Sequence, residues 1–207
     1  MNRQQGKTVA ELFGHPPLAQ EGRDRLIAAG IELFSRHGIQ AVGLDQIIAL
    51  AGVTKTTFYK HFESKDELAV EAVRRRHEWE LVAWDRAVHE LAGDCPRKQL
   101  VAYYDVLDLW FNDPDFRGCL FINSAAEFPN PHDPIHRVAA EHKRRVRDHF
   151  RSLAALAGVT EPEAFADRYT ALFEGTLVLR QVHDRNDAAR VMKPAVEQML
   201  RDALGNA

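Results

Sequence analysis

The stretch Leu44-Asp-Gln-Ile-Ile-Ala-Leu-Ala-Gly-Val-Thr-Lys-Thr-Thr-Phe-Tyr-Lys-His-Phe62 predicts two short helices joined by a tight turn. Gly52 tolerates the positive φ that ends a helix, so we expect the first helix to stop there. Thr54 follows, and its hydroxyl is suited to cap the second helix. Each helix has an apolar face at helical spacing, formed by Ile47, Ile48 and Ala51 in the first and by Phe58 and Phe62 in the second.

The outer face of the second predicted helix is rich in hydrogen-bond donors and carries no acidic residue. These donors are Lys55, Thr56, Thr57, Tyr59, Lys60 and His61. A helix pair with a glycine in its turn and a basic second helix is typical of proteins that read the major groove of DNA. The alternative is a helical hairpin with a solvated face, but such a face usually also contains Glu and Asp.

Composition places the chain among ordinary globular proteins. Of its 207 residues, 45% are hydrophobic and 28% are charged, which is enough apolar material for a sizeable core. No apolar run is long enough to span a bilayer, and the N-terminus has no signal-peptide pattern. Two distant cysteines, Cys95 and Cys119, do not make a disulfide framework, so we expect a cytoplasmic protein.

Charge is distributed unevenly along the chain. The formal net charge is −3, but the first 76 residues contain 11 Lys and Arg against 9 Asp and Glu. The remainder is acidic. The cations that phosphate contacts require therefore lie in the N-terminal part, although a bias this small does not identify a DNA-binding protein by itself.

The hydrophobic pattern predicts an all-α fold with about nine helices. Residues 1–22 show little periodicity and contain several glycines and prolines, so we expect a flexible arm there. We expect a three-helix domain over residues 23–68 and a larger helical bundle over residues 69–207, the latter including helices Pro162–His183 and Ala188–Leu204. Ser64 and Glu67 form a capping-box pattern at the start of the fourth helix.

At these residues the chain resembles the tetracycline-repressor (TetR) family of bacterial transcription regulators. The resemblance lies in Ile47, in the run from Ala51 to Phe62 and in Ser64-Lys-Asp-Glu-Leu68, preceded by a pattern of Ala28, Gly30, Leu33, Phe34 and Gly38. It implies a homodimer whose N-terminal domains each read half of a palindromic operator. It also implies a small-molecule effector pocket in each C-terminal domain, and a dimer interface made by the helices Pro162–His183 and Ala188–Leu204.

The resemblance also implies roles for individual residues. The side chains expected to contact DNA are Thr54, Lys55, Thr57, Tyr59, Lys60, His61 and Lys65. Among them Lys55 is the candidate for a base edge, because lysine donates to guanine, whereas Tyr59, His61 and Lys65 suit phosphates. Gly43 departs from the family, which often has Thr or Ser there as a helix cap, so we expect a slightly weaker helix after it.

An effector pocket is less clearly indicated. The candidate lining residues are Trp84, Tyr104, Leu107, Trp110, Phe111, Cys119, Asn123, Glu127 and His142. Such a pocket would suit an apolar or aromatic molecule, with Asn123, Glu127 or His142 as polar anchors. Aromatic residues at helical spacing are, however, more often plain core.

Cys119 supports a second hypothesis, that of an oxidant- or electrophile-sensing repressor. Arg117 and a helix N-terminus nearby would favour its thiolate. An inert buried cysteine is the simpler alternative, since the sequence offers no partner thiol close by.

Other classes of protein find little support. The sequence lacks a Gly-rich phosphate loop, a nucleophile elbow and a zinc helix, so we expect no catalytic residue, no metal site and no cofactor. A DNA-binding protein without any effector is the remaining alternative, and the long C-terminal region argues against it.

Overall fold

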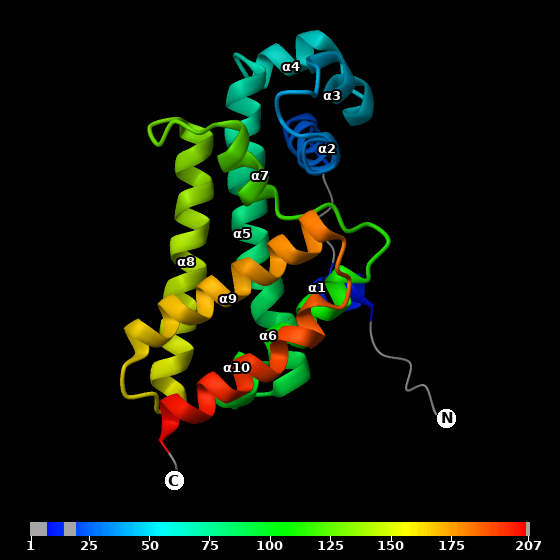
Figure 1. Ribbon diagram of the computed structural model, residues 1–207. Coiled ribbons are helices and arrows are strands. Elements are labelled where there is room, and N and C mark those ends of the chain that lie inside the picture. The colour runs from blue at the N-terminus through cyan, green and yellow to red at the C-terminus, as the bar shows by residue number, and fades with distance from the viewer. Residues whose placement is uncertain (1–7, 15–19, 206–207) are drawn as a thin grey trace, which may run out of the picture. The chain divides into compact units, whose positions relative to one another are not determined.

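The computed structural model describes residues 8–14 and 20–205 of the chain, and in this part it is all α-helical (Figure 1). Ten helices are present within the described residues. In chain order they are α1 (Val9–Phe13), α2 (Gly22–His37), α3 (Leu44–Ala51), α4 (Lys55–His61), α5 (Lys65–Ala92), α6 (Pro96–Phe111), α7 (Leu120–Glu127), α8 (Pro134–Ala157), α9 (Pro162–His183) and α10 (Ala188–Leu204). The all-α prediction is confirmed.

Helix α1 corrects the prediction of a flexible arm, for the described part of residues 1–22. Thr8 and Glu11 form a complete capping box at its start, with the Thr8 hydroxyl accepting from the Glu11 N–H. Leu12 and Phe13 are buried, and the Arg86 guanidinium donates to the Leu12 carbonyl over 2.9 and 2.7 Å. A five-residue helix is too short to show a period in the sequence, so its two buried apolar residues are not a recognisable pattern.

The chain divides into two compact units. We call residues 15–80 and 117–143 the α4 unit, and residues 1–14, 81–116 and 144–207 the α9 unit. This division differs from the boundary expected near residue 68, because α7 and the first part of α8 group with α2, α3 and α4. The division falls within α5 and within α8, so each of these helices contributes to both units.

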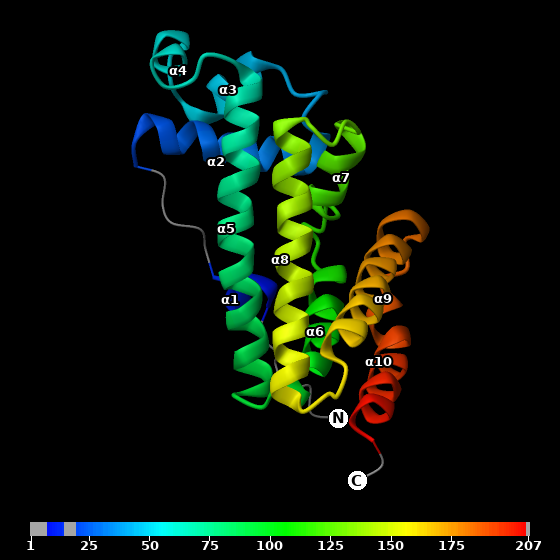
Figure 2. The same ribbon diagram turned by 90° about the vertical axis from the view of Figure 1, so that its left-hand side faces the viewer.

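The α4 unit is built around the buried faces of α2, α3 and α4, which lie together in Figures 1 and 2. Its core residues are fully or almost fully buried: Leu26, Ile27, Phe34, Ile39, Ile47, Phe58, Phe62 and Leu68. Three of them, Ile47, Phe58 and Phe62, belong to the two apolar faces read from the sequence, so the amphipathic pattern correctly placed this part of the core.

The α9 unit has a core of aromatic rings. Trp84 stacks on Tyr103 with ring centroids 5.9 Å apart, and meets Trp110 edge-on at the same distance. Phe173 of α9 packs edge-on against Trp84 and lies 5.3 Å from Phe150 of α8. Offset and edge-on ring pairs of this kind stabilise a core beyond the area that they bury.

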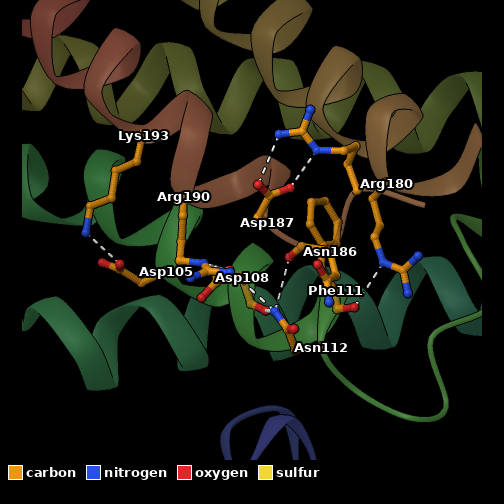
Figure 3. Close-up of polar contacts among 10 residues, drawn as sticks. Asp105, Asp108, Phe111, Asn112, Arg180, Asn186, Asp187, Arg190 and Lys193 are labelled. Atoms are coloured by element: carbon orange, nitrogen blue, oxygen red, sulfur yellow. Dashed lines mark hydrogen bonds and ion pairs between the residues drawn. The ribbon is translucent and has the colours of Figure 1, made fainter. Parts of the chain in front are cut away.

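Helices α9 and α10 run beside each other in both views, and α10 also packs along α6 (Figures 1 and 2). Polar contacts fix this packing (Figure 3): Lys193 donates to Asp105 over 2.6 Å, and Arg190 pairs with Asp108 at 3.1 Å. The Arg180 Nε atom donates to the carbonyl of Phe111 over 3.0 Å. Within the described residues, no helix is both long enough and apolar enough to span a bilayer.

Candidate nucleic-acid interface

The turn between α3 and α4 has the predicted geometry. Gly52 ends α3 in the left-handed region, with φ 62° and ψ 39°, where a side chain would be strained. Thr54 then caps α4, because its hydroxyl accepts from the backbone N–H of Thr57 over 3.1 Å. Both ends of the turn are therefore fixed by local contacts.

The outer face of α4 is exposed, while its inner face is anchored. Phe58 is completely buried and Phe62 is 2% exposed, so these two rings hold the helix against the unit. The Lys55 side chain is 63% exposed and Tyr59 is 54% exposed, and Lys60 is also exposed. An exposed face of donors on a helix anchored by its inner side is the arrangement that groove reading requires.

Two of the predicted DNA contacts, Thr57 and His61, are half-buried. They lie beside the start of α2: a Cβ added at Gly22 would stand 3.2 Å from the Thr57 methyl and 3.7 Å from the His61 Nε2 atom. Lys55 has one acidic neighbour, Asp45, at 4.0 Å, and both side chains are exposed. Such a surface pair contributes little and would not prevent Lys55 from turning to DNA.

Lys65, also predicted to contact phosphate, is engaged within the protein. Its Nζ atom donates to the carbonyl of Ile39 over 2.9 Å and to the carbonyl of Val42 over 3.0 Å. An ammonium has three hydrogens, so one is left for another acceptor. The sequence pattern could not reveal this contact, because it joins residues 23 and 26 positions apart.

The nine predicted effector residues are divided between the two units. Five of them lie in the α9 unit: Trp84, Tyr104, Leu107, Trp110 and Phe111. The other four, Cys119, Asn123, Glu127 and His142, lie in the α4 unit. Within the α9 unit, Trp84 and Trp110 are in ring contact, and both remain partly exposed.

Tyr104 has an unusual environment in the α9 unit. It is 1% exposed, and its hydroxyl makes no hydrogen bond within the described part of the chain. The Thr176 hydroxyl donates to the carbonyl of Leu172 over 2.7 Å. Burial raises the pKa of Tyr104 well above its usual value, so the phenol is neutral and offers a buried donor that lacks a partner.

His142 belongs to a buried polar cluster in the α4 unit. Its ring stacks on Phe121 with centroids 3.5 Å apart, and its Nδ1 atom lies 3.0 Å from His77 Nδ1. The Glu80 carboxylate, 3.8 Å from His142 Nε2, also accepts from Arg76 over 2.5 Å. Burial, together with the nearby Lys143, His77 and Arg76, lowers the pKa of His142 to about 2, so its imidazole is neutral.

Cys119 and Glu127 stand at opposite ends of α7. The Lys143 ammonium donates to the sulfur of Cys119 over 3.5 Å, and the cysteine is 6% exposed. Glu127 accepts from the backbone N–H groups of Ile39 and Gln40, and is thus bound to the loop before α3. Asn123 lies between them and is half-buried. None of these four α4-unit residues lines the cleft described next.

The α4 unit contains a cleft of about 500 Å³. Its lining combines apolar side chains with charged side chains of both signs, and includes Phe62, Val70, Phe128, Ile135, Arg23 and Glu71. Local sequence patterns do not indicate this cleft, because segments from separate parts of the chain form it. Among the described residues, no three His, Cys, Asp or Glu side chains are placed to hold a metal ion.

Helices α9 and α10 expose apolar side chains. On α9, Val178 is 43% and Val182 is 69% exposed, and on α10 Val191 is 55% exposed. A Cβ added at Gly175, one turn before Val178, would meet no atom within 4 Å. These residues leave an apolar strip without cover in the single chain.

Two family models match the chain. The model for bacterial regulatory proteins of the tetR family matches residues 26–72. The model for the tetracyclin repressor-like C-terminal domain matches residues 96–196. Together they cover more than half of the sequence. The matched residues include α3, α4 and the turn between them, and most of the C-terminal helices.

Individual proteins agree with this match. The chain is 22% identical over 155 residues to the HTH-type transcriptional regulator YjdC of Escherichia coli, covering 75% of this chain and 81% of that protein. It is 34% identical over 109 residues to the HTH-type transcriptional activator FasR of Mycolicibacterium smegmatis, covering 53% and 49%. The crystal structure of SCO4454, a TetR-family regulator from Streptomyces coelicolor, aligns with a TM-score of 0.80 at 29% identity, covering 89% of this chain and 96% of that one.

Proposed function

This chain belongs to the TetR family of DNA-binding transcriptional regulators, and on that premise we propose that it is a homodimeric repressor. Two copies of α4 bind the two halves of a palindromic operator, and a small apolar or aromatic effector releases the dimer. The expected separation of the two recognition helices is about one DNA turn, ~34–36 Å, or a longer multiple of it. A protein that acts on operator DNA works in the cytoplasm.

The observation that carries this proposal is the exposed donor face of α4 on a helix fixed at both ends. Thr54 caps its start, and Phe58 and Phe62 anchor its inner side. Because these contacts hold the backbone, the outward side chains reach DNA without a large loss of conformational entropy. The absence of acidic residues from α4 removes the repulsion that phosphates would otherwise meet.

We assign Lys55 to a base edge, since it stands in the first turn of α4 and its side chain is exposed. The residues assigned to the DNA backbone are Thr54, Thr57, Tyr59, Lys60 and His61. Lys65 contributes to a phosphate at most its one remaining N–H, because the other two serve the protein. The start of α5 adds backbone donors there.

The dimer forms through α9 and α10. The strip of Gly175, Val178 and Val182 repeats at intervals of three and four residues, as in helix pairs that pack side by side. The small residues Ala171 and Gly175 let two α9 helices approach closely, and Val191 is an exposed apolar residue of α10. Burying this strip removes apolar area from water, which drives association.

We place the effector in the aromatic core of the α9 unit. Trp84 and Trp110 offer ring faces, and the buried Tyr104 hydroxyl offers a hydrogen bond that no described protein atom takes. An aromatic molecule with one hydrogen-bonding atom fits this set of groups. Its binding would have to favour the released conformation over the DNA-bound one in order to act as an inducer.

The test is a binding titration of full-length protein on an enriched genomic duplex and on a random duplex, at several salt concentrations. The proposal predicts a dimer that prefers the enriched duplex by about 10³-fold or more. It also predicts a log–log salt slope of about −4 or steeper. Equal binding to both duplexes contradicts it. Because FasR is named an activator, a promoter-fusion assay then decides between repression and activation.

The contact between Lys143 and Cys119 favours a second candidate function, in which Cys119 senses an oxidant or electrophile. An ammonium 3.5 Å from the sulfur stabilises the thiolate, which is the reactive form. Exposed Cys95 provides an internal control. If Cys119 is the sensor, the reagent releases DNA from Cys95→Ser but not from Cys119→Ser. Release from both variants assigns induction to a different site.

A further inference from the structure

The loop that joins α2 to α3, residues 38–43, is held from two sides by charged side chains. Glu127, the last residue of α7, accepts from the N–H of Ile39 over 3.0 Å and from the N–H of Gln40 over 2.7 Å. Lys65, the first residue of α5, donates to the carbonyls of Ile39 and Val42. We propose that Lys65 and Glu127 are positioning residues that set the orientation of α3 and α4 for operator binding. This inference rests on the proposed function.

The loop needs such support because α3 lacks a side-chain cap. Gly43 occupies the cap position and has no hydroxyl or carboxylate to offer. Only the reverse half of a capping box is present, in which Gly43 N–H donates to Gln46 Oε1 over 2.7 Å. Hydrogen bonds from main-chain groups to ionised side chains are stronger than neutral ones. Four of them, on the main-chain groups of Ile39, Gln40 and Val42, therefore hold the segment that enters α3 where no side-chain cap does so.

The packing around Glu127 is specific to this loop. Gly38 has a φ of +82°, and a Cβ there would lie 2.8 Å from Glu127 Oε1. Gln40 returns a contact, with its Nε2 atom donating to the Glu127 carbonyl over 2.6 Å. Ile39 is fully buried, so its peptide cannot replace these partners with water when they are lost. The position of the Glu127 carboxylate therefore depends on glycine at position 38.

The consequence is that α7 belongs to the DNA-reading apparatus, although about 60 residues of sequence separate it from α4. Glu127 binds the segment immediately before α3, and α3 leads through Gly52 directly into α4. A shift of the Glu127 carboxylate would free two N–H groups of the loop and loosen the start of α3. Both α3 and α4 would then sample more orientations. This lowers the affinity for the operator sequence more than the affinity for random DNA.

The sign of the mutational effect separates this role from simple electrostatics. Glu127→Ala removes a negative charge, which by itself strengthens binding to all DNA. We call the contacts of Glu127 and Lys65 with residues 38–43 the clamp. If the clamp positions α3 and α4, Glu127→Ala should bind the enriched genomic duplex about tenfold more weakly, with less than a twofold change on a random duplex. Glu127→Gln keeps one acceptor oxygen and should lie between the wild type and Glu127→Ala. Glu78→Ala, an exposed acidic residue of α5, is the matched control.

A second readout follows the loop itself. Hydrogen exchange at the amides of Ile39 and Gln40 should be at least tenfold faster in Glu127→Ala than in Glu78→Ala, with the rest of α2 unchanged. Unchanged exchange at these amides overturns the clamp, as does specific binding that stays within twofold of the wild type. Should Glu127→Ala fail to fold, Glu127→Gln gives both readouts. If the wild type enriches no duplex, the proposed function fails, and with it the positioning role, whatever the amides show.

Discussion

Helices α4 and α9 have similarly well-buried inner faces, but the exposed face of α4 is polar and that of α9 carries apolar residues. Phe58 holds α4 and Phe173 holds α9, with exposures of 0% and 5%. Outside, α4 presents amines and hydroxyls, whereas α9 presents Gly175, Val178 and Val182. A buried face fixes where a helix lies, and the exposed face indicates what it binds. On this comparison we propose that α4 binds DNA and that α9 binds a second copy of the chain.

Among the substitutions that test this comparison, Val178→Arg should have the largest effect, on dimer formation. It places an unpaired guanidinium within the apolar α9 strip, which costs about 3 kcal/mol or more on association. We expect a dimer at least ~100-fold weaker, measured by analytical ultracentrifugation. Val82→Arg makes the same change at a 70% exposed position of α5 and should leave the dimer intact. Equal loss in both variants would remove α9 from the interface.

On the α4 side, Lys55→Ala should weaken operator binding by about 2 kcal/mol, the worth of a good base contact. Specificity should relax at one position in each half-site. Lys98→Ala, an exposed lysine of α6, removes the same charge elsewhere. Competition titrations with single-base operator variants provide the measurement. A uniform loss on specific and random duplexes would reassign Lys55 to a phosphate.

The buried side of the α4 unit should affect stability rather than affinity. His142 has a pKa of about 2 when folded, against roughly 6.5 when unfolded. Between these values only the unfolded chain binds the proton, so stability falls as the pH drops below 6.5. This group alone contributes a loss of about 1 kcal/mol from pH 7 to pH 5.5. His149, whose pKa burial also lowers, acts in the same direction.

Urea unfolding at the two pH values measures this loss. His142→Gln should show a smaller drop than the wild type, while His132→Ala, at an exposed site, should keep the full drop. The same pH dependence in His142→Gln and the wild type would mean that other groups are responsible.

The smallest effect should come from Tyr59→Phe, which removes one hydroxyl from the exposed face of α4 and keeps the ring against Phe58. We expect operator binding to weaken by about 0.5–1 kcal/mol, with no change in the melting temperature of the dimer. Unchanged affinity in a fluorescence-anisotropy titration would exclude the Tyr59 hydroxyl from the contacts.

Local patterns in the sequence predicted the elements whose determinants are local. Gly52 and Thr54 set the turn through contacts within five residues, and both were read correctly. The bounds of α9 and α10 were also predicted, because a proline begins α9 and a glycine follows α10. In the Ser64–Glu67 pattern, the Ser64 hydroxyl accepts from Glu67 N–H as expected, but Glu67 accepts from Glu63 instead of Ser64.

Features that join distant segments could not be predicted in this way. Glu127 was expected to anchor an effector, yet it binds a loop 87 and 88 positions earlier in the chain. Lys65 and helix α1 are comparable cases, since their partners lie 23 to 74 residues away. A charged side chain shows no periodicity that identifies its partner, so only the fold reveals such contacts. The assignments of single residues to DNA and effector remain predictions.

The most direct test of the whole account is a selection of genomic fragments by the purified full-length protein at near-physiological salt, read by sequencing. The account predicts one enriched palindrome whose half-sites are about one DNA turn apart, and a palindrome that is degenerate at one position of each half-site in Lys55→Ala. Enrichment of the same palindrome by Lys55→Ala, or no enrichment by effector-free wild-type protein, would contradict the claim that the α4 face reads an operator.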